Sequence, residues 1–112
     1  RVEVAHERAE LVGRNERLRE RFELVTARSF AEPAVTAEIA TGLLAVDGIL
    51  VVSEPPESDG SRWDPAGLAE LGFGAASVVG SEDAHFAVLT KLAPTPARFP
   101  RGVGRPAKRP LW

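Results

Sequence analysis

The residues with the clearest chemical potential are basic side chains near the C-terminal end of the chain. The last twenty-two residues contain six bases and no acid, whereas the first ninety contain eight bases and all sixteen acids. Clustered Lys and Arg contact phosphates and release counterions, which dominates binding to polyanions such as nucleic acids. The candidate phosphate-binding residues are Arg98, Arg101, Arg105, Lys108 and Arg109.

The same stretch is rich in Pro and Gly, a composition that is also typical of a solvated tail without regular structure. Its aromatic residues leave two interpretations open. Phe99 and Trp112 could stack on splayed bases, as in readers of single-stranded RNA. Alternatively, these rings and Leu111 could pin the tail to the protein's own surface. We expect at least part of the tail to be ordered by such packing.

Other chemistries have little support in this sequence. There is no cysteine, so disulfides and thiolate metal sites are excluded, and His6 and His85 are too far apart in sequence to suggest a metal site. We therefore expect no metal partner. No window is long and apolar enough for a membrane span, so we expect no membrane partner either. No nucleophile and base, and no pair of carboxylates, occur in a catalytic arrangement.

The elements that must position these residues alternate between strands and helices. Short apolar runs predict strands at residues 2–5, 22–26, 49–52, 73–79 and 85–90. A helix should begin at Pro33 and end at Asp47-Gly48, and a second should run from Asp64-Pro65 to Gly72. This order predicts an α/β fold with a mainly parallel sheet, closed by an antiparallel hairpin.

A chain of 112 residues is one domain at most, here divided into a body (residues 1–93) and a basic tail (residues 94–112). The sequence contains no Met and opens at Arg1. We therefore expect it to be the C-terminal part of a longer protein.

Three segments together are similar to one family of bacterial enzymes. They are Glu7-Arg8-Ala9-Glu10, Val25-Thr26-Ala27-Arg28-Ser29-Phe30-Ala31, and the tail from Pro94 to Leu111, which includes Arg98-Phe99-Pro100-Arg101 and Lys108-Arg109-Pro110. In this order and strand context they resemble the small-subunit ribosomal RNA methyltransferase G family, also called glucose-inhibited division protein B. The resemblance covers the whole chain as the C-terminal half of the family's domain.

The resemblance implies a cytoplasmic class I methyltransferase with a Rossmann-like three-layer fold. Such an enzyme transfers a methyl group from S-adenosylmethionine to N7 of a guanine in 16S ribosomal RNA. The strand at 2–5 would be the third of seven, and the four later strands the fourth to seventh. The first two strands, with the Gly-rich cofactor loop, would be missing, so that the fragment alone would be inactive.

The resemblance also implies three cofactor-binding residues. Ala9 and Glu10 would border the adenine after the first visible strand, although they could equally form an ordinary helix start with an acid at its positive end. Arg28 would follow the next strand beside the transferred methyl group, where a guanidinium can bind a carboxylate or phosphate bidentately. Its alternative role is an ion pair with Glu32 or Glu38.

Two positions depart from the family pattern. Many members have a Lys-Gly pair where this chain reads Ser53-Glu54, and Arg-His where it reads Ala84-His85. Both changes remove positive charge near the expected RNA site. They leave two rival interpretations, namely a diverged methyltransferase with another acceptor and a non-catalytic RNA-binding module.

Overall fold

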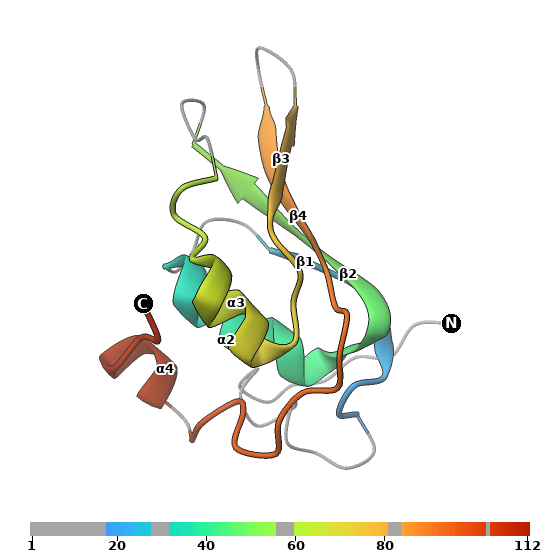
Figure 1. Ribbon diagram of the computed structural model, residues 1–112, viewed down its shortest axis with the longest axis vertical. Helices are drawn as coiled ribbons and strands as arrows, with labels where there is room; N and C mark the ends of the chain where they lie inside the picture. Colours follow the sequence, from blue (N-terminus) through green and yellow to red (C-terminus); the bar gives the residue numbers. More distant parts are fainter. Residues whose placement is uncertain (1–17, 28–31, 56–59, 81–83, 103) are drawn as a thin grey trace.

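In a computed structural model of the protein, the described residues form a four-stranded mixed sheet (Figure 1). The structure describes residues 18–27, 32–55, 60–80, 84–102 and 104–112. The sheet order is β1 (Phe22–Ala27), β2 (Leu44–Glu54), β4 (His85–Thr90) and β3 (Ser77–Gly80). Strands β1 and β2 are parallel, whereas β4 is antiparallel to both of its neighbours.

Two helices pack on one face of this sheet, α2 (Pro33–Leu43) and α3 (Pro65–Leu71). Alternate residues of the two central strands, Leu50 and Val52 of β2 and Ala87 and Leu89 of β4, are buried against them. Burial of these side chains is the main favourable term for folding. The rest of the core consists of Ala37, Ala40, Leu44, Trp63, Leu68, Leu71, Phe73 and Phe99.

Helix α3 begins and ends where the sequence predicted. The Asp64 carboxylate accepts a hydrogen bond of 3.0 Å from the Gly67 N–H, Pro65 occupies the first turn, and Gly72 caps the C-terminus with φ 94°. These contacts satisfy backbone groups that a helix end otherwise leaves unpaired.

The prediction that α2 ends at Asp47-Gly48 is wrong. The helix ends at Leu43, and β2 begins at the next residue. Asp47 takes the positive φ, 74°, inside the strand, and its N–H donates to the Lys91 carbonyl at 2.7 Å. The turn-forming pair therefore bends a long strand instead of capping a helix, and the register between β1 and β2 shifts beside it.

The remaining strand predictions had mixed outcomes. The structure confirms the strands at 22–26 and 85–90 and the antiparallel hairpin that joins β3 to β4. The predicted strand at 73–79 is too long, because Phe73 makes only one isolated bridge, to Lys91, and β3 starts at Ser77. The predicted strand at 2–5 lies outside the described residues.

The basic tail folds back onto the helical layer. It follows β4 along α2 and α3 and ends in the short helix α4 (Arg105–Lys108), which packs against α2. Phe99 is 2 % exposed and belongs to the core, and the Trp112 indole N–H donates to the Arg62 carbonyl at 2.9 Å. The expectation that packing orders part of the tail is therefore confirmed.

Candidate functional site

The carboxyl ends of the parallel strands β1 and β2 form the first candidate site. Ala27 pairs with Val52 there, and in α/β sheets ligands bind beyond this end of the strands. The three predicted cofactor residues, Ala9, Glu10 and Arg28, lie outside the described residues, so their placement stays a prediction. Arg28 directly follows Ala27 in sequence.

A hollow of about 280 Å³ lies at this end of the sheet. It is lined by Thr26, Ala27, Val51, Ser53 and Phe86. Val51, Ser53 and Phe86 alternate with buried core residues along their strands, so the hollow opens on the face turned away from α2 and α3. These five residues offer apolar contact and two hydroxyl groups, and none of the five is an acid or a base. Such a lining can bind and orient a ligand.

Glu54, the first departure from the family pattern, ends β2 with a fully buried side chain. Its carboxylate accepts a hydrogen bond from Arg62, and another of 2.8 Å from the Trp63 indole N–H. Arg62 thus compensates the buried charge of Glu54, and the bond from Trp63 joins Glu54 to the core. Sequence reasoning missed Arg62, since nothing in the sequence indicates that it contacts Glu54, eight residues earlier.

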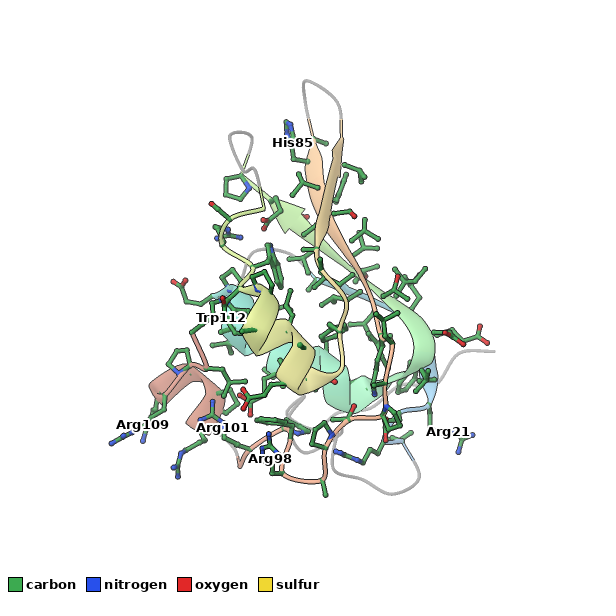
Figure 2. All side chains as sticks on the ribbon, in the orientation of Figure 1. Arg21, His85, Arg98, Arg101, Arg109 and Trp112 are labelled. Atoms are coloured by element: carbon green, nitrogen blue, oxygen red, sulfur yellow. The ribbon has the colours of Figure 1, made fainter. Side chains whose placement is uncertain are left out.

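His85, beside the second departure, begins β4 and pairs in register with both Glu54 and Gly80. It lies far from the basic residues of the tail (Figure 2). Its Nδ1 atom is buried and has no hydrogen-bond partner among the described residues. The preceding residue, Ala84, is exposed.

The basic C-terminal stretch, which consists of Lys91 and the tail, is the second candidate site, and its first base is buried. The side chain of Lys91 is fully buried. Its ammonium donates to Glu20 at 2.7 Å and to the Thr41 and Leu44 carbonyls at 2.9 and 2.6 Å. Burial lowers the pKa of Lys91, against the opposing effect of Glu20. The pKa of Glu20 is also lowered, because hydrogen bonds from Lys91 and the Thr95 N–H outweigh the effect of burial. Lys91 therefore joins the tail to the end of α2.

Two of the predicted RNA-binding residues form ion pairs with acids of the helices. Arg101 binds the Glu38 carboxylate with two nitrogens, Nη2 at 2.7 Å and Nε at 2.9 Å, and this bond raises the pKa of Arg101. Arg98 is exposed, lies 3.5 Å from Glu70, and places its guanidinium 4.6 Å from the centre of the Phe99 ring. Glu38 is thus the partner of Arg101; sequence reasoning had named it only as a possible partner of Arg28.

The other three predicted residues, Arg105, Lys108 and Arg109, are exposed on α4 and its C-cap. Arg98, Arg101 and Arg109 lie on the same side of the molecule (Figure 2), where the Arg101 guanidinium is bound by the buried Glu38. The structure thus gathers the basic residues around α4. Of the two interpretations of the aromatic residues, packing on the protein itself is confirmed over base stacking. Phe99 is buried, and Trp112 lies against Gly67 of α3.

Features of membrane and metal-binding proteins are missing from the part of the chain that the structure describes. Within the described ranges, no helix has the length and apolar character needed to cross a bilayer. The same residues contain no group of three or more His, Cys, Asp or Glu side chains that could hold a metal ion.

An α/β chain with a ligand-sized hollow at its parallel strand ends and a basic surface at its terminus defines a candidate nucleotide- or nucleic-acid-binding protein. No family model matches the sequence. The chain is 41 % identical over 98 % of its length to a ribosomal RNA small subunit methyltransferase G from Chloroflexus aggregans. It is 37 % identical to the protein of that name from Roseiflexus castenholzii and 32 % identical to the one from Lactobacillus johnsonii.

These similarities confirm the resemblance predicted from the sequence. The chain is homologous, over nearly its whole length, to ribosomal RNA small subunit methyltransferase G. It spans about half the length of the curated relatives that it matches, 49 % of the Chloroflexus protein and 50 % of the Roseiflexus protein.

Proposed function

We propose that this chain is part of an S-adenosylmethionine-dependent methyltransferase that modifies N7 of a guanine in 16S ribosomal RNA. The observation that carries the proposal is the similarity of almost the entire chain to proteins named for small-subunit ribosomal RNA methylation. The substrate would be the RNA or the small ribosomal subunit, and the reaction would take place in the cytoplasm.

The observed strand order supports a class I arrangement. We propose that β1, β2, β3 and β4 are the fourth to seventh strands of a Rossmann-like methyltransferase sheet. The order β1-β2-β4-β3 puts the last strand between its two predecessors and antiparallel to both. The remaining strands would then extend the sheet beyond β1, whose Leu24 is 58 % exposed.

The hollow beside β1 and β2 fits part of such a cofactor. Val51 and Phe86 offer apolar surface for a flat ring, and the Thr26 and Ser53 side chains offer hydroxyls for polar groups. Ala9, Glu10 and Arg28 would complete the binding. The cofactor supplies a methyl group on a positively charged sulfur, which needs no catalytic base when the acceptor is the free lone pair of guanine N7. The described part of the lining has no acid or base to act as a catalytic base, which suits that demand, because orientation and exclusion of water are what the protein must contribute.

Arg98, Arg101, Arg105, Lys108 and Arg109 would provide the affinity for RNA. The exposed members carry positive charge on an otherwise acidic chain, and this local charge attracts phosphates at close range. Arg62 neutralises the charge of Glu54, so this departure from the family pattern adds no net negative charge at the end of β2.

The test is methyl incorporation by the full-length protein into small ribosomal subunits isolated without this modification. We expect labelled methyl groups on one guanine of 16S RNA and none on free nucleosides. Labelling of free nucleosides would instead indicate the diverged methyltransferase with a small acceptor. Calorimetric titration with S-adenosylmethionine separates both enzymes from the non-catalytic RNA-binding module, which would bind RNA but release no heat with the cofactor.

The candidate cofactor residue Arg28 can be tested in the same assay. We expect Arg28→Ala to lower methyl transfer by about tenfold or more, because it removes a charge-assisted hydrogen bond near the reacting group. Arg28→Lys is the matched control, because it keeps the charge but not the bidentate geometry, and it should recover only part of the rate. Unchanged turnover and cofactor affinity in Arg28→Ala would remove this residue from the site.

A further inference from the structure

An ion pair with a buried carboxylate attaches the segment that carries α4 to the helical layer. We propose that Glu38 and Arg101 are positioning residues for RNA binding, which hold α4 so that Arg105, Lys108 and Arg109 face the phosphates together. This inference rests on the proposed function of the tail. It assigns a role in RNA binding to an acidic residue, Glu38, which charge alone would place among the residues that oppose binding.

The pair joins the helical layer to α4 through a single guanidinium. Glu38 lies in α2 with a fully buried side chain, and both of its oxygens accept bonds from Arg101, whose backbone N–H adds a third contact of 2.8 Å. The same Arg101 Nη2 donates to the Arg109 carbonyl at 2.6 Å. Bidentate, charge-assisted bonds of this kind fix orientation as well as distance.

A second set of contacts holds the segment on either side of Arg101. The Arg19 guanidinium donates to the Phe99 and Pro96 carbonyls at 2.6 and 3.1 Å. Beyond α4, the Trp112 ring rests on Gly67, where an added Cβ atom would overlap it. A helix of four residues has no stability of its own, so these attachments determine where α4 lies.

The attachments leave the charges of α4 exposed. Arg105 and Lys108 are three residues apart on one helical turn, and Arg109 follows as the C-cap. Because Arg101 binds the backbone of Arg109, the pair constrains a cationic residue directly. Cations that are fixed before binding lose less conformational entropy when they meet phosphates, which favours affinity.

The proposal predicts an effect opposite in sign to simple electrostatics. Removing a negative charge near a phosphate-binding surface should strengthen RNA binding by Coulomb attraction. If Glu38 positions α4, its removal should weaken binding instead. The chain offers a matched control in Glu70, which also faces a tail arginine, but in an exposed pair with side chains 54 % and 62 % exposed. Pairs of that kind contribute little to structure.

The experiment compares Glu38→Gln and Glu70→Gln in the full-length protein. Binding to 16S RNA transcribed in vitro would be measured by filter retention over a series of KCl concentrations. We expect Glu38→Gln to weaken binding by about five- to tenfold and to reduce the salt slope, because fewer phosphates are bound at once. Glu70→Gln should bind equally or more tightly. A Glu38→Gln variant that binds as tightly as wild type would overturn the proposal.

A second variant, without a change of charge, tests the proposal in case Glu38→Gln fails to fold. Gly67→Ala should displace the Trp112 ring and loosen the far side of α4, while Ala itself favours the helix in which it stands. We expect weaker RNA binding by a protein that still unfolds cooperatively in urea. If both Gly67→Ala and a folded Glu38→Gln retain wild-type affinity, α4 needs no positioning and the inference fails.

A direct phosphate contact by Arg101 is the competing explanation. In that case Arg101→Ala weakens binding and Glu38→Gln does not, which refutes the positioning role. If the pair acts as a unit, the double variant should bind no more weakly than either single variant, and Arg101→Lys should restore only part of the affinity.

A further variant distinguishes failure of the positioning role from failure of the proposed RNA-binding function of the tail. Neutralising Arg105, Lys108 and Arg109 together tests whether the tail binds RNA at all. Unchanged affinity would refute the RNA-binding role of the tail. Reduced affinity in this triple variant, with an unaffected Glu38→Gln, would refute the positioning role alone.

Discussion

The basic residues near the C-terminus fall into two regions that use positive charge differently. In the first region, Lys91 to Arg101, the ammonium of Lys91 is buried and the Arg101 guanidinium is bound by a buried carboxylate, while Arg98 between them is exposed. In the second region, Arg105 to Arg109, the three cations are exposed. One run of basic sequence therefore serves first to attach the tail and then to present charge, and each function can be disturbed separately.

The largest expected effect comes from the buried end of the first region. We expect Lys91→Met to destabilise the protein by about 3 kcal/mol, because it removes the ammonium donor from the Leu44 carbonyl, the Glu20 carboxylate and the Thr41 carbonyl. Glu20 and Thr41 each keep a hydrogen bond from Thr95. The free energy of unfolding in urea measures this effect. Lys108→Met is the control, since an exposed lysine of the second region should change stability by less than about 0.5 kcal/mol. Equal stability of both variants would contradict the division into two regions.

The reverse pattern is expected in the second region. Replacing Arg105, Lys108 and Arg109 by Gln should leave the urea midpoint near the wild-type value. Affinity for 16S RNA should fall by about ten- to a hundredfold at low salt, and the slope of log K against log salt should drop by about one for each phosphate that the variant no longer binds. An unaltered slope would show that these cations meet no phosphates.

The division between the two regions was only partly predictable from the sequence. The count of bases identified the tail as cationic, yet composition cannot show that Lys91 is buried. Its partners Glu20 and Thr41 are separated from it by 71 and 50 residues, so the pairing emerges only when the chain folds. Phe99 was assigned correctly only as an alternative, because a lone aromatic residue in a Pro-rich segment suits both a core and a base-stacking surface.

Predictions for the fold succeeded where the determinants were local. The Asp64 cap and the Gly72 terminus depend on neighbouring backbone groups, and both were confirmed. The end of α2 was wrong because Asp47-Gly48 forms a turn in either context, and the choice between them depends on pairing with Lys91, far along the chain. In the candidate site, the strand ends of β1 and β2 could be predicted from apolar runs. The contribution of Phe86 to the hollow could not, since it requires β4 to lie beside β2.

The smallest expected effect concerns the acid side of the first region. Because the pKa of Glu20 is lowered in the folded protein, its ionised form stabilises the fold above the ordinary value of 4.5. That contribution disappears as the pH falls through the lower, folded value, where the carboxylate gains a proton and its attraction to Lys91 ends. We expect Glu20→Gln to cost about 1 kcal/mol at pH 7, discounted for the partial exposure of this side chain, and less at pH 3. Urea unfolding of both proteins at the two pH values measures the difference. If the difference in unfolding free energy between the two proteins is the same at both pH values, the Glu20 charge contributes nothing to the attachment of the tail. Lys91 would then be held by the Thr41 and Leu44 carbonyls alone.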